Sequence, residues 1–74
     1  MNTTISREEG LLKRIKMRLA RQDVDKKDID ILARVTYLKR IDQKPEDVFD
    51  KKSFVRLGLI SNWYNITSDA LRGV

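Results

Sequence analysis

Apolar residues recur at spacings of three and four along most of the chain, which is the period of an amphipathic helix. The first such segment, about fifteen residues long, places its apolar side chains at Leu11, Leu12, Ile15 and Leu19. Ser6 and Glu9 precede this stripe with the spacing of a capping box, which satisfies free amides at a helix start. Residues 1–5 show no period, so the sequence predicts a flexible N-terminal arm over 1–5 and a single helical domain over 6–74.

A second periodic region covers residues 26–43. Asp25 is expected to cap its first helix, with Asp28 in the first turn, and the buried face falls on Ile29, Leu32 and Ala33. Leu38 and Ile41 continue the spacing, but the Val35-Thr36-Tyr37 cluster between them has weaker helix propensity. The pattern therefore leaves open whether 26–43 forms one long helix or two short ones.

Pro45, followed by two acids, is typical of a helical first turn, because proline suits the first helical position. Asp50 is expected to cap the next helix, whose apolar positions are Phe54, Leu57, Ile60 and Tyr64. Residues 65–67 interrupt this pattern.

The last segment carries the signals of one more short helix. Thr67 is a candidate N-cap, Ile66 and Leu71 are spaced as a hydrophobic staple, and Gly73 stands where a left-handed C-cap belongs. Together, the segments predict an all-α protein of five short helices without strands.

Composition changes this picture by excluding chemistry. The 74 residues include no Cys and no His, which removes disulfides, thiol nucleophiles, cysteine zinc sites and the usual general base. The sequence contains no phosphate-binding glycine loop, metal-ligand spacing or nucleophile motif, and no apolar run approaches the length of a membrane helix. We therefore expect a non-enzymatic cytoplasmic protein with no cofactor, metal, small-molecule substrate or membrane contact.

The charge of the chain favours a polyanionic partner. Lys and Arg number 16 against 11 acids, a net charge of +5. Many of the basic residues lie in one stretch that has no acid, at Lys13, Arg14, Lys16, Arg18 and Arg21. Such a run either neutralises phosphates or forms a solvated helix face, and the sequence alone does not choose between these.

The segment from Leu57 to Gly73 resembles the end of a lambda-repressor-like (Cro/C1-type) helix-turn-helix domain, which closes its fourth helix and opens its fifth there. The similarity covers seventeen residues and rests on core and cap positions. Residues 24–29 are similar to the entry into the family's second helix, and Leu38 and Ile41 to the apolar pair of its recognition helix. The chain departs from the pattern at Asp30, where the family has a small residue, and at Arg34, where it has the turn glycine.

This resemblance implies a compact five-helix lambda-repressor-like domain that binds duplex DNA as a small phage or mobile-element transcriptional regulator. It places the DNA-binding surface on the second and third helices, at Lys26, Lys27, Arg34, Thr36, Tyr37, Lys39, Arg40 and Lys44.

Because the helix-turn-helix unit departs from the pattern, an antirepressor or modulator that binds a repressor-type protein is the alternative. Trp63 and Tyr64 are adjacent, so both cannot face one core, and the resemblance buries Tyr64. Trp63 and Phe49 are then the candidate contacts for a protein partner or a homodimer, although Trp63 could instead pack on Phe49 or Phe54. RNA binding through the basic first helix is a third hypothesis.

Overall fold

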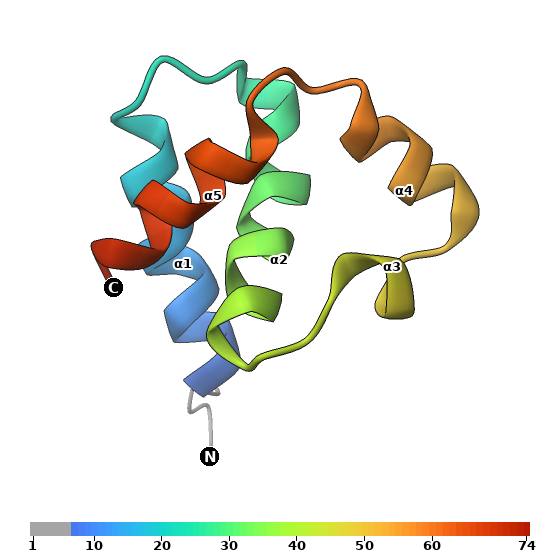
Figure 1. Cartoon of the computed structure of the whole chain (residues 1–74). Helices are drawn as coiled ribbons and strands as arrows, with labels where there is room; N and C mark the ends of the chain where they lie inside the picture. The colour runs from blue at the N-terminus through green and yellow to red at the C-terminus, as the bar shows by residue number, and fades with distance from the viewer. Residues whose placement is uncertain (1–6) are drawn as a thin grey trace.

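All regular structure in the part of the chain described by the computed structural model, residues 7–74, is helical. Five α-helices and one short 3₁₀ turn follow one another in Figure 1: α1 (Arg7–Ala20), the turn Lys26–Asp28, α2 (Ile29–Arg40), α3 (Pro45–Val48), α4 (Lys51–Gly58) and α5 (Trp63–Arg72). The predicted all-α class is confirmed for these residues. Residues 1–6, with the predicted arm and the Ser6 cap, lie outside them.

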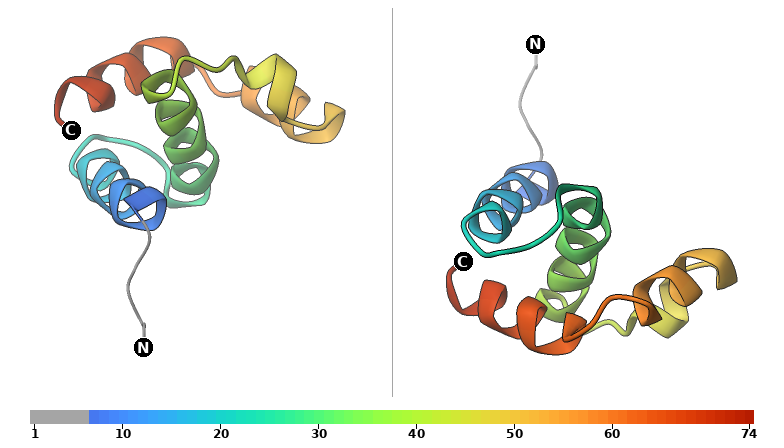
Figure 2. Two further views of the ribbon diagram at one scale, coloured as in Figure 1. Left: turned by 90° about the horizontal axis from the view of Figure 1, so that it is seen from below. Right: turned by 90° about the horizontal axis from the view of Figure 1, so that it is seen from above.

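Helices α1, α2 and α5 pack together into a three-helix bundle (Figures 1 and 2). Its centre is formed by side chains with no exposed surface: Ile15, Leu19, Leu32, Val35 and Ala70. Leu11 and Leu12 pack against this core from the first turns of α1. The apolar stripe predicted for the first helix is therefore the face that α1 buries.

Residues 26–40 form one continuous helical segment, which answers the question that the sequence left open. Asp25 caps the 3₁₀ turn by accepting a hydrogen bond from the Lys27 amide at 3.2 Å, and α2 follows without a break. Arg34, where a helix-turn-helix unit would turn, lies in the middle of α2. Most of the residues that the resemblance assigned to two helices therefore belong to a single helix, and the lambda-repressor-like fold is not confirmed.

The end of α2 is set by a Schellman motif. The Gln43 amide donates to the Leu38 carbonyl at 2.8 Å and the Asp42 amide to the Lys39 carbonyl at 3.2 Å. Asp42 takes the left-handed conformation that this motif requires, with φ of 61°. The prediction of a left-handed cap at Gly73 is wrong, because its φ is −91°.

The boundary between α4 and α5 also differs from the prediction. Asp50 caps α4 as expected, accepting from the Ser53 amide at 3.2 Å, but the helix ends at Gly58 and α5 already begins at Trp63. Thr67 is therefore an interior residue, not an N-cap. Its buried hydroxyl donates to the Trp63 carbonyl at 2.8 Å, four residues earlier in the same helix.

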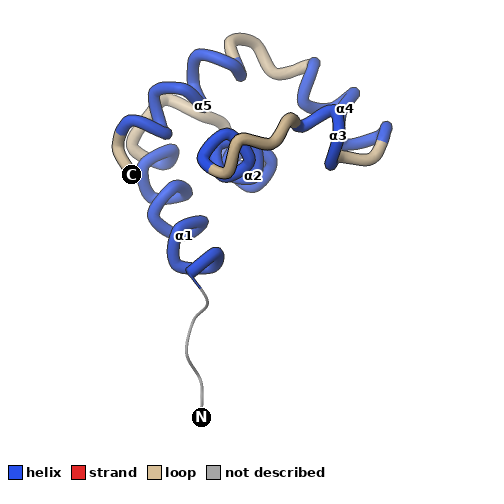
Figure 3. Tube along the Cα trace, turned by 60° about the horizontal axis from the view of Figure 1, so that its bottom comes forward, coloured by secondary structure: helices blue, strands red, loops and turns tan. Residues whose placement is uncertain are grey.

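Helices α3 and α4, residues 45–58, form an arm that stands to one side of the bundle (Figures 2 and 3). Leu57 is 1% exposed and anchors α4, while the Arg56 guanidinium donates to the Lys27 carbonyl at 2.7 Å. The remaining large apolar side chains of α4, Phe54 and Val55, are exposed. The arm is thus held at a few points and leaves most of its apolar face uncovered.

Candidate nucleic-acid interface

The eight residues predicted to bind DNA do not form one surface, because they surround a helix that is largely buried. Lys26 and Lys27 are exposed at the start of α2, beside α4. Arg34, Tyr37 and Arg40 lie near the first turns of α1, and Lys39 and Lys44 face α5. The predicted interface is therefore divided among three parts of the molecule.

Thr36 cannot contact DNA in this fold, and its assignment to the interface is wrong. Its side chain is fully buried, and its hydroxyl donates to the Leu32 carbonyl at 2.9 Å. This internal bond satisfies the hydroxyl within α2 and lets a β-branched residue occupy the centre of the helix.

Lys39 is engaged inside the protein. Its ammonium lies 3.1 Å from the Tyr64 carbonyl and 2.7 Å from the Ser68 hydroxyl, and 3.7 Å from the centre of the Tyr64 ring. Partial burial lowers the pKa of Lys39 because it disfavours the charged form. Lys39 therefore links α2 to α5. A hollow between these helices is lined by Lys39 and also by Lys44, which is exposed.

Arg34 and Tyr37 are also tied to neighbours. The Arg34 guanidinium lies 4.7 Å from the centre of the Phe49 ring, and the Tyr37 hydroxyl donates to the Glu8 carboxylate at 3.3 Å. Desolvation, and then the Glu8 charge and hydrogen bond, raise the pKa of Tyr37. Arg40 is exposed and shares a shallow hollow with Arg7 and Leu11.

The two residues predicted as protein contacts face inward. Phe49 is 8% exposed and belongs to the core, and Trp63 is half-buried against that core. Tyr64, which the resemblance placed inside, is 63% exposed and meets the Trp63 ring edge-on at 5.8 Å. The assignment of these neighbours is therefore reversed: Trp63, at the start of α5, packs against the core, and Tyr64 is exposed.

Three arginines of α1 and a fourth in the turn directly after it lie along one side of the helix instead. Successive residues of an α-helix are rotated by about 100° about its axis, so residues 7, 14, 18 and 21 fall within a sector of about 60° around that axis. They extend along the whole helix, about 21 Å for its fourteen residues at 1.5 Å each. We call these residues the arginine stripe: Arg7, Arg14, Arg18 and Arg21.

The arginine stripe is not neutralised by acids. Within residues 7–74 none of the four guanidiniums forms an ion pair, whereas Lys16, on another face of α1, lies 3.0 Å from Asp30. Arg7, Arg14 and Arg21 are exposed, and Arg18 lies across Gly73, where any Cβ would collide with its side chain. The run without acids was visible in the sequence, but only the direction of the core separates the stripe from Lys13 and Lys16.

The described residues contain no group of His, Cys, Asp or Glu side chains that could hold a metal ion. None of their helices is long and apolar enough to cross a membrane. Comparisons with models of known families, with curated proteins and with solved structures found no match for this chain.

Proposed function

We propose that this protein is a small non-enzymatic regulator that binds duplex DNA through the arginine stripe of α1. The observation that carries the proposal is the set of four arginines along one side of α1 and the turn after it, none of which has an ion-pair partner among the described residues. Unpaired arginines suit phosphate oxygens because each guanidinium offers several donors in one plane. This proposal moves the DNA contact from α2 to α1.

The length of the stripe sets the size of the expected contact. About 21 Å of helix spans roughly six base pairs at 3.4 Å each, and four arginines reach about four phosphates. Neutralising four phosphates gives a slope of about −3.6 in the logarithm of the binding constant against the logarithm of salt concentration. Binding should then weaken on the order of 100-fold between about 50 and 200 mM salt.

The test is fluorescence anisotropy with a labelled duplex of about 20 base pairs over that range of salt. The double variant Arg14→Gln/Arg21→Gln removes two exposed members of the stripe, so we expect its salt slope to halve to about −1.8. The matched control, Lys51→Gln/Lys52→Gln, removes the same net charge from α4 and should keep most of the original slope. The proposal would be contradicted if both double variants lost the same part of the salt slope. It would also be contradicted if the original chain did not bind the duplex at about 50 mM salt.

A second candidate function is the modulation of a repressor-type protein, and the uncovered face of α4 favours it. Phe54 is 40% and Val55 55% exposed, and exposed apolar groups of this kind are common at protein contacts. The test adds the chain to preformed complexes of helix-turn-helix repressors with their operators and follows release of the DNA. Release that Phe54→Asp abolishes would support this function, and stable complexes would count against it.

A further inference from the structure

Three of the four stripe arginines line one hollow, which has a volume of about 370 Å³ and opens where the end of α1 meets the end of α5. Among the described residues, no acidic side chain lines it. The lining residues are Arg14, Met17, Arg18, Arg21, Gly73 and Val74. The hollow therefore collects three guanidinium groups without a carboxylate side chain to neutralise them.

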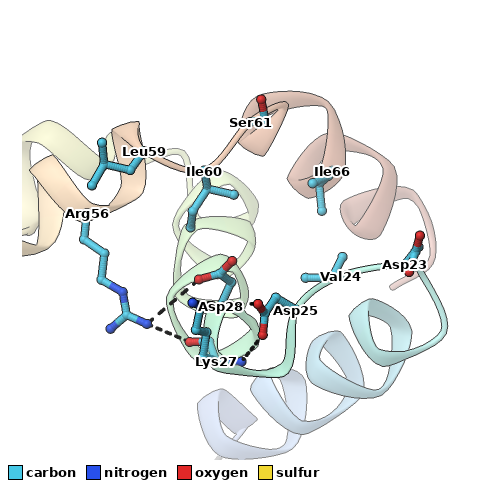
Figure 4. A pocket seen from close by; sticks show the side chains of 10 residues that line it. All are labelled: Asp23, Val24, Asp25, Lys27, Asp28, Arg56, Leu59, Ile60, Ser61 and Ile66. Atoms are coloured by element: carbon cyan, nitrogen blue, oxygen red, sulfur yellow. Dashed lines mark hydrogen bonds and ion pairs between the residues drawn. The ribbon is translucent and has the colours of Figure 1, made fainter.

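A second, larger hollow of about 620 Å³ shows the opposite case, in which the basic residues are already engaged (Figure 4). The Lys27 ammonium lies 3.9 Å from the Asp25 carboxylate. The Arg56 guanidinium lies 3.9 Å from the Asp28 carboxylate and donates to the Lys27 carbonyl at 2.7 Å. Positive charge in that hollow is matched by acids of the same chain, so it offers no free site for an anion.

The arginines of the smaller hollow have no such partners. Within residues 7–74 none of the three guanidiniums donates a hydrogen bond to another residue or forms an ion pair with a carboxylate. Arg14 and Arg21 are exposed, and Arg18 is half-buried. An anion that enters the hollow therefore gains charge-assisted hydrogen bonds without breaking any bond within the protein.

Gly73 decides where the third guanidinium lies. A Cβ at this position would lie 2.7 Å from both Cδ and Cζ of Arg18, which is closer than any ordinary side-chain contact. The backbone does not itself require glycine here, because φ is −91°. The missing side chain is thus what admits Arg18, whose charge lies at the C-terminal end of α5, where the helix dipole favours a cation.

We propose that Arg14, Arg18 and Arg21 bind a phosphate monoester in this hollow, with Gly73 as the positioning residue that admits Arg18. A phosphate monoester carries about two negative charges at neutral pH and has three oxygens that accept strong hydrogen bonds. A phosphodiester of the DNA backbone carries one charge. Three free guanidiniums in one hollow match the monoester better, because each planar donor group can bind one of its oxygens.

The terminal phosphate at the 5′ end of a DNA strand is the source of a monoester that agrees with the arginine stripe. The choice of this source rests on the proposed DNA binding, whereas the binding of the monoester itself does not. Duplex DNA can bind along the stripe without any preference for a terminal phosphate, and a monoester can bind in the absence of DNA. The two proposals can therefore fail separately.

Titration of the full chain with methyl phosphate, followed by the NMR signals of the arginine Nε–H groups, tests the site without DNA. We expect saturable shifts at the three arginines, and a dissociation constant at least about ten-fold higher for dimethyl phosphate, which carries one charge fewer. Affinity for methyl phosphate should fall as the pH is lowered from about 7 to about 5, because a monoester loses its second charge near pH 6. The side chains that line the hollow and carry charge are arginines, whose charge is constant over this range, so the loss belongs to the ligand.

The variant Gly73→Ala should displace the Arg18 side chain and raise the dissociation constant for methyl phosphate about five-fold or more. The matched control is Gly58→Ala, because a Cβ at Gly58 meets nothing within 4 Å, and its dissociation constant should be unchanged. Adding Gly73→Ala to Arg18→Gln should cause no further loss, since the glycine acts through that arginine. Circular dichroism should show the same helical content in all variants.

Equal affinity for methyl and dimethyl phosphate, or the absence of saturable shifts at the three arginines, would overturn the monoester site. A further loss from Gly73→Ala in the Arg18→Gln background would overturn the role of Gly73. Anisotropy with the labelled duplex, with and without 5′-phosphates, identifies the source. A gain in affinity from the 5′-phosphate that disappears in Gly73→Ala supports a DNA end, and equal affinities of the two duplexes would overturn that source in favour of a small free monoester.

Discussion

Helix α2, at the centre of the three-helix bundle, and helix α4, in the arm, bury very different shares of their residues. In α2, six of twelve residues are buried, whereas in α4 Leu57 is the one buried residue of eight. Both helices carry apolar residues at helical spacing, but α2 lies against α1 and α5, and α4 has one contact region along the start of α2. The difference shows that periodicity identifies the apolar face of a helix without saying what covers it.

The comparison predicts different consequences for one chemical change in the two regions. Leu32 and Leu57 are both essentially unexposed, at 0% and 1%. Leu32→Ala should lower the free energy of unfolding of the whole protein by about 2–5 kcal/mol, since it opens a cavity at the centre of the bundle. Leu57→Ala should mainly release α4, because Leu57 is the buried residue of that helix.

Native-state hydrogen exchange distinguishes these outcomes. In Leu57→Ala the amides of α4 should exchange faster while those of α2 keep their protection. In Leu32→Ala all protected amides should lose protection together. Equal loss of protection in α2 for both variants would show that the arm and the bundle unfold as one unit, and would remove the distinction between them.

A smaller effect is expected from the polar link between α2 and α5. Lys39→Met removes the two hydrogen bonds from the ammonium to Tyr64 and Ser68 and should lower the free energy of unfolding by about 1–3 kcal/mol. Lys44→Met is the matched control, because Lys44 is exposed and lines the hollow that Lys39 also lines. This substitution should change the free energy of unfolding by less than about 0.5 kcal/mol. Urea denaturation measures both, and equal effects would mean that Lys39 contributes only its charge.

The smallest expected effect is a loss of capping in acid, confined to α4. The hydrogen bonds from Ser53, through its side chain and then its amide, lower the pKa of Asp50. A lowered folded-state pKa means that the cap stabilises α4 above about pH 4, the usual range of an unfolded aspartate, and is lost as the pH falls through the lower folded value.

Amide chemical shifts of the first turn of α4, followed by NMR between neutral pH and about pH 2, would detect this fraying. Asp50→Asn is the matched control, because asparagine also caps helices but does not titrate in this range. Its first turn should keep the same shifts across the titration. A first turn of α4 that frays equally in the variant would assign the acid effect to another group.

Several local features of the fold could be predicted because they depend on neighbouring residues alone. The caps at Asp25 and Asp50 and the proline at the first position of α3 are formed as expected. The start of α5 could not be predicted in this way, because Thr67 has the same hydroxyl whether it caps a helix or bonds back to an earlier carbonyl. In the folded chain Trp63 packs against the core and begins α5, so Thr67 is an interior residue of that helix and not its N-cap.

The candidate interface could likewise be predicted from the sequence only in part. The sequence showed the acid-free basic run in α1, but it also supported a DNA surface on residues 26–44, which the continuous α2 divides into separate parts. Whether Arg34 or Lys39 is free depends on Phe49 and Tyr64, which lie far from them in the chain. Such contacts follow from how the helices are arranged and not from spacing.

The sequence by itself determined the all-α class, the apolar faces of α1 and α2 and the caps of the 3₁₀ turn and α4, because these depend on side chains within one or two helical turns. The tertiary structure decided that residues 26–40 form one helix, that Trp63 and not Tyr64 faces the core, and that α4 stands in an arm with Leu59 exposed beside a hollow. The physical reason is that burial is a property of two surfaces in contact, and a sequence pattern specifies one of them at a time.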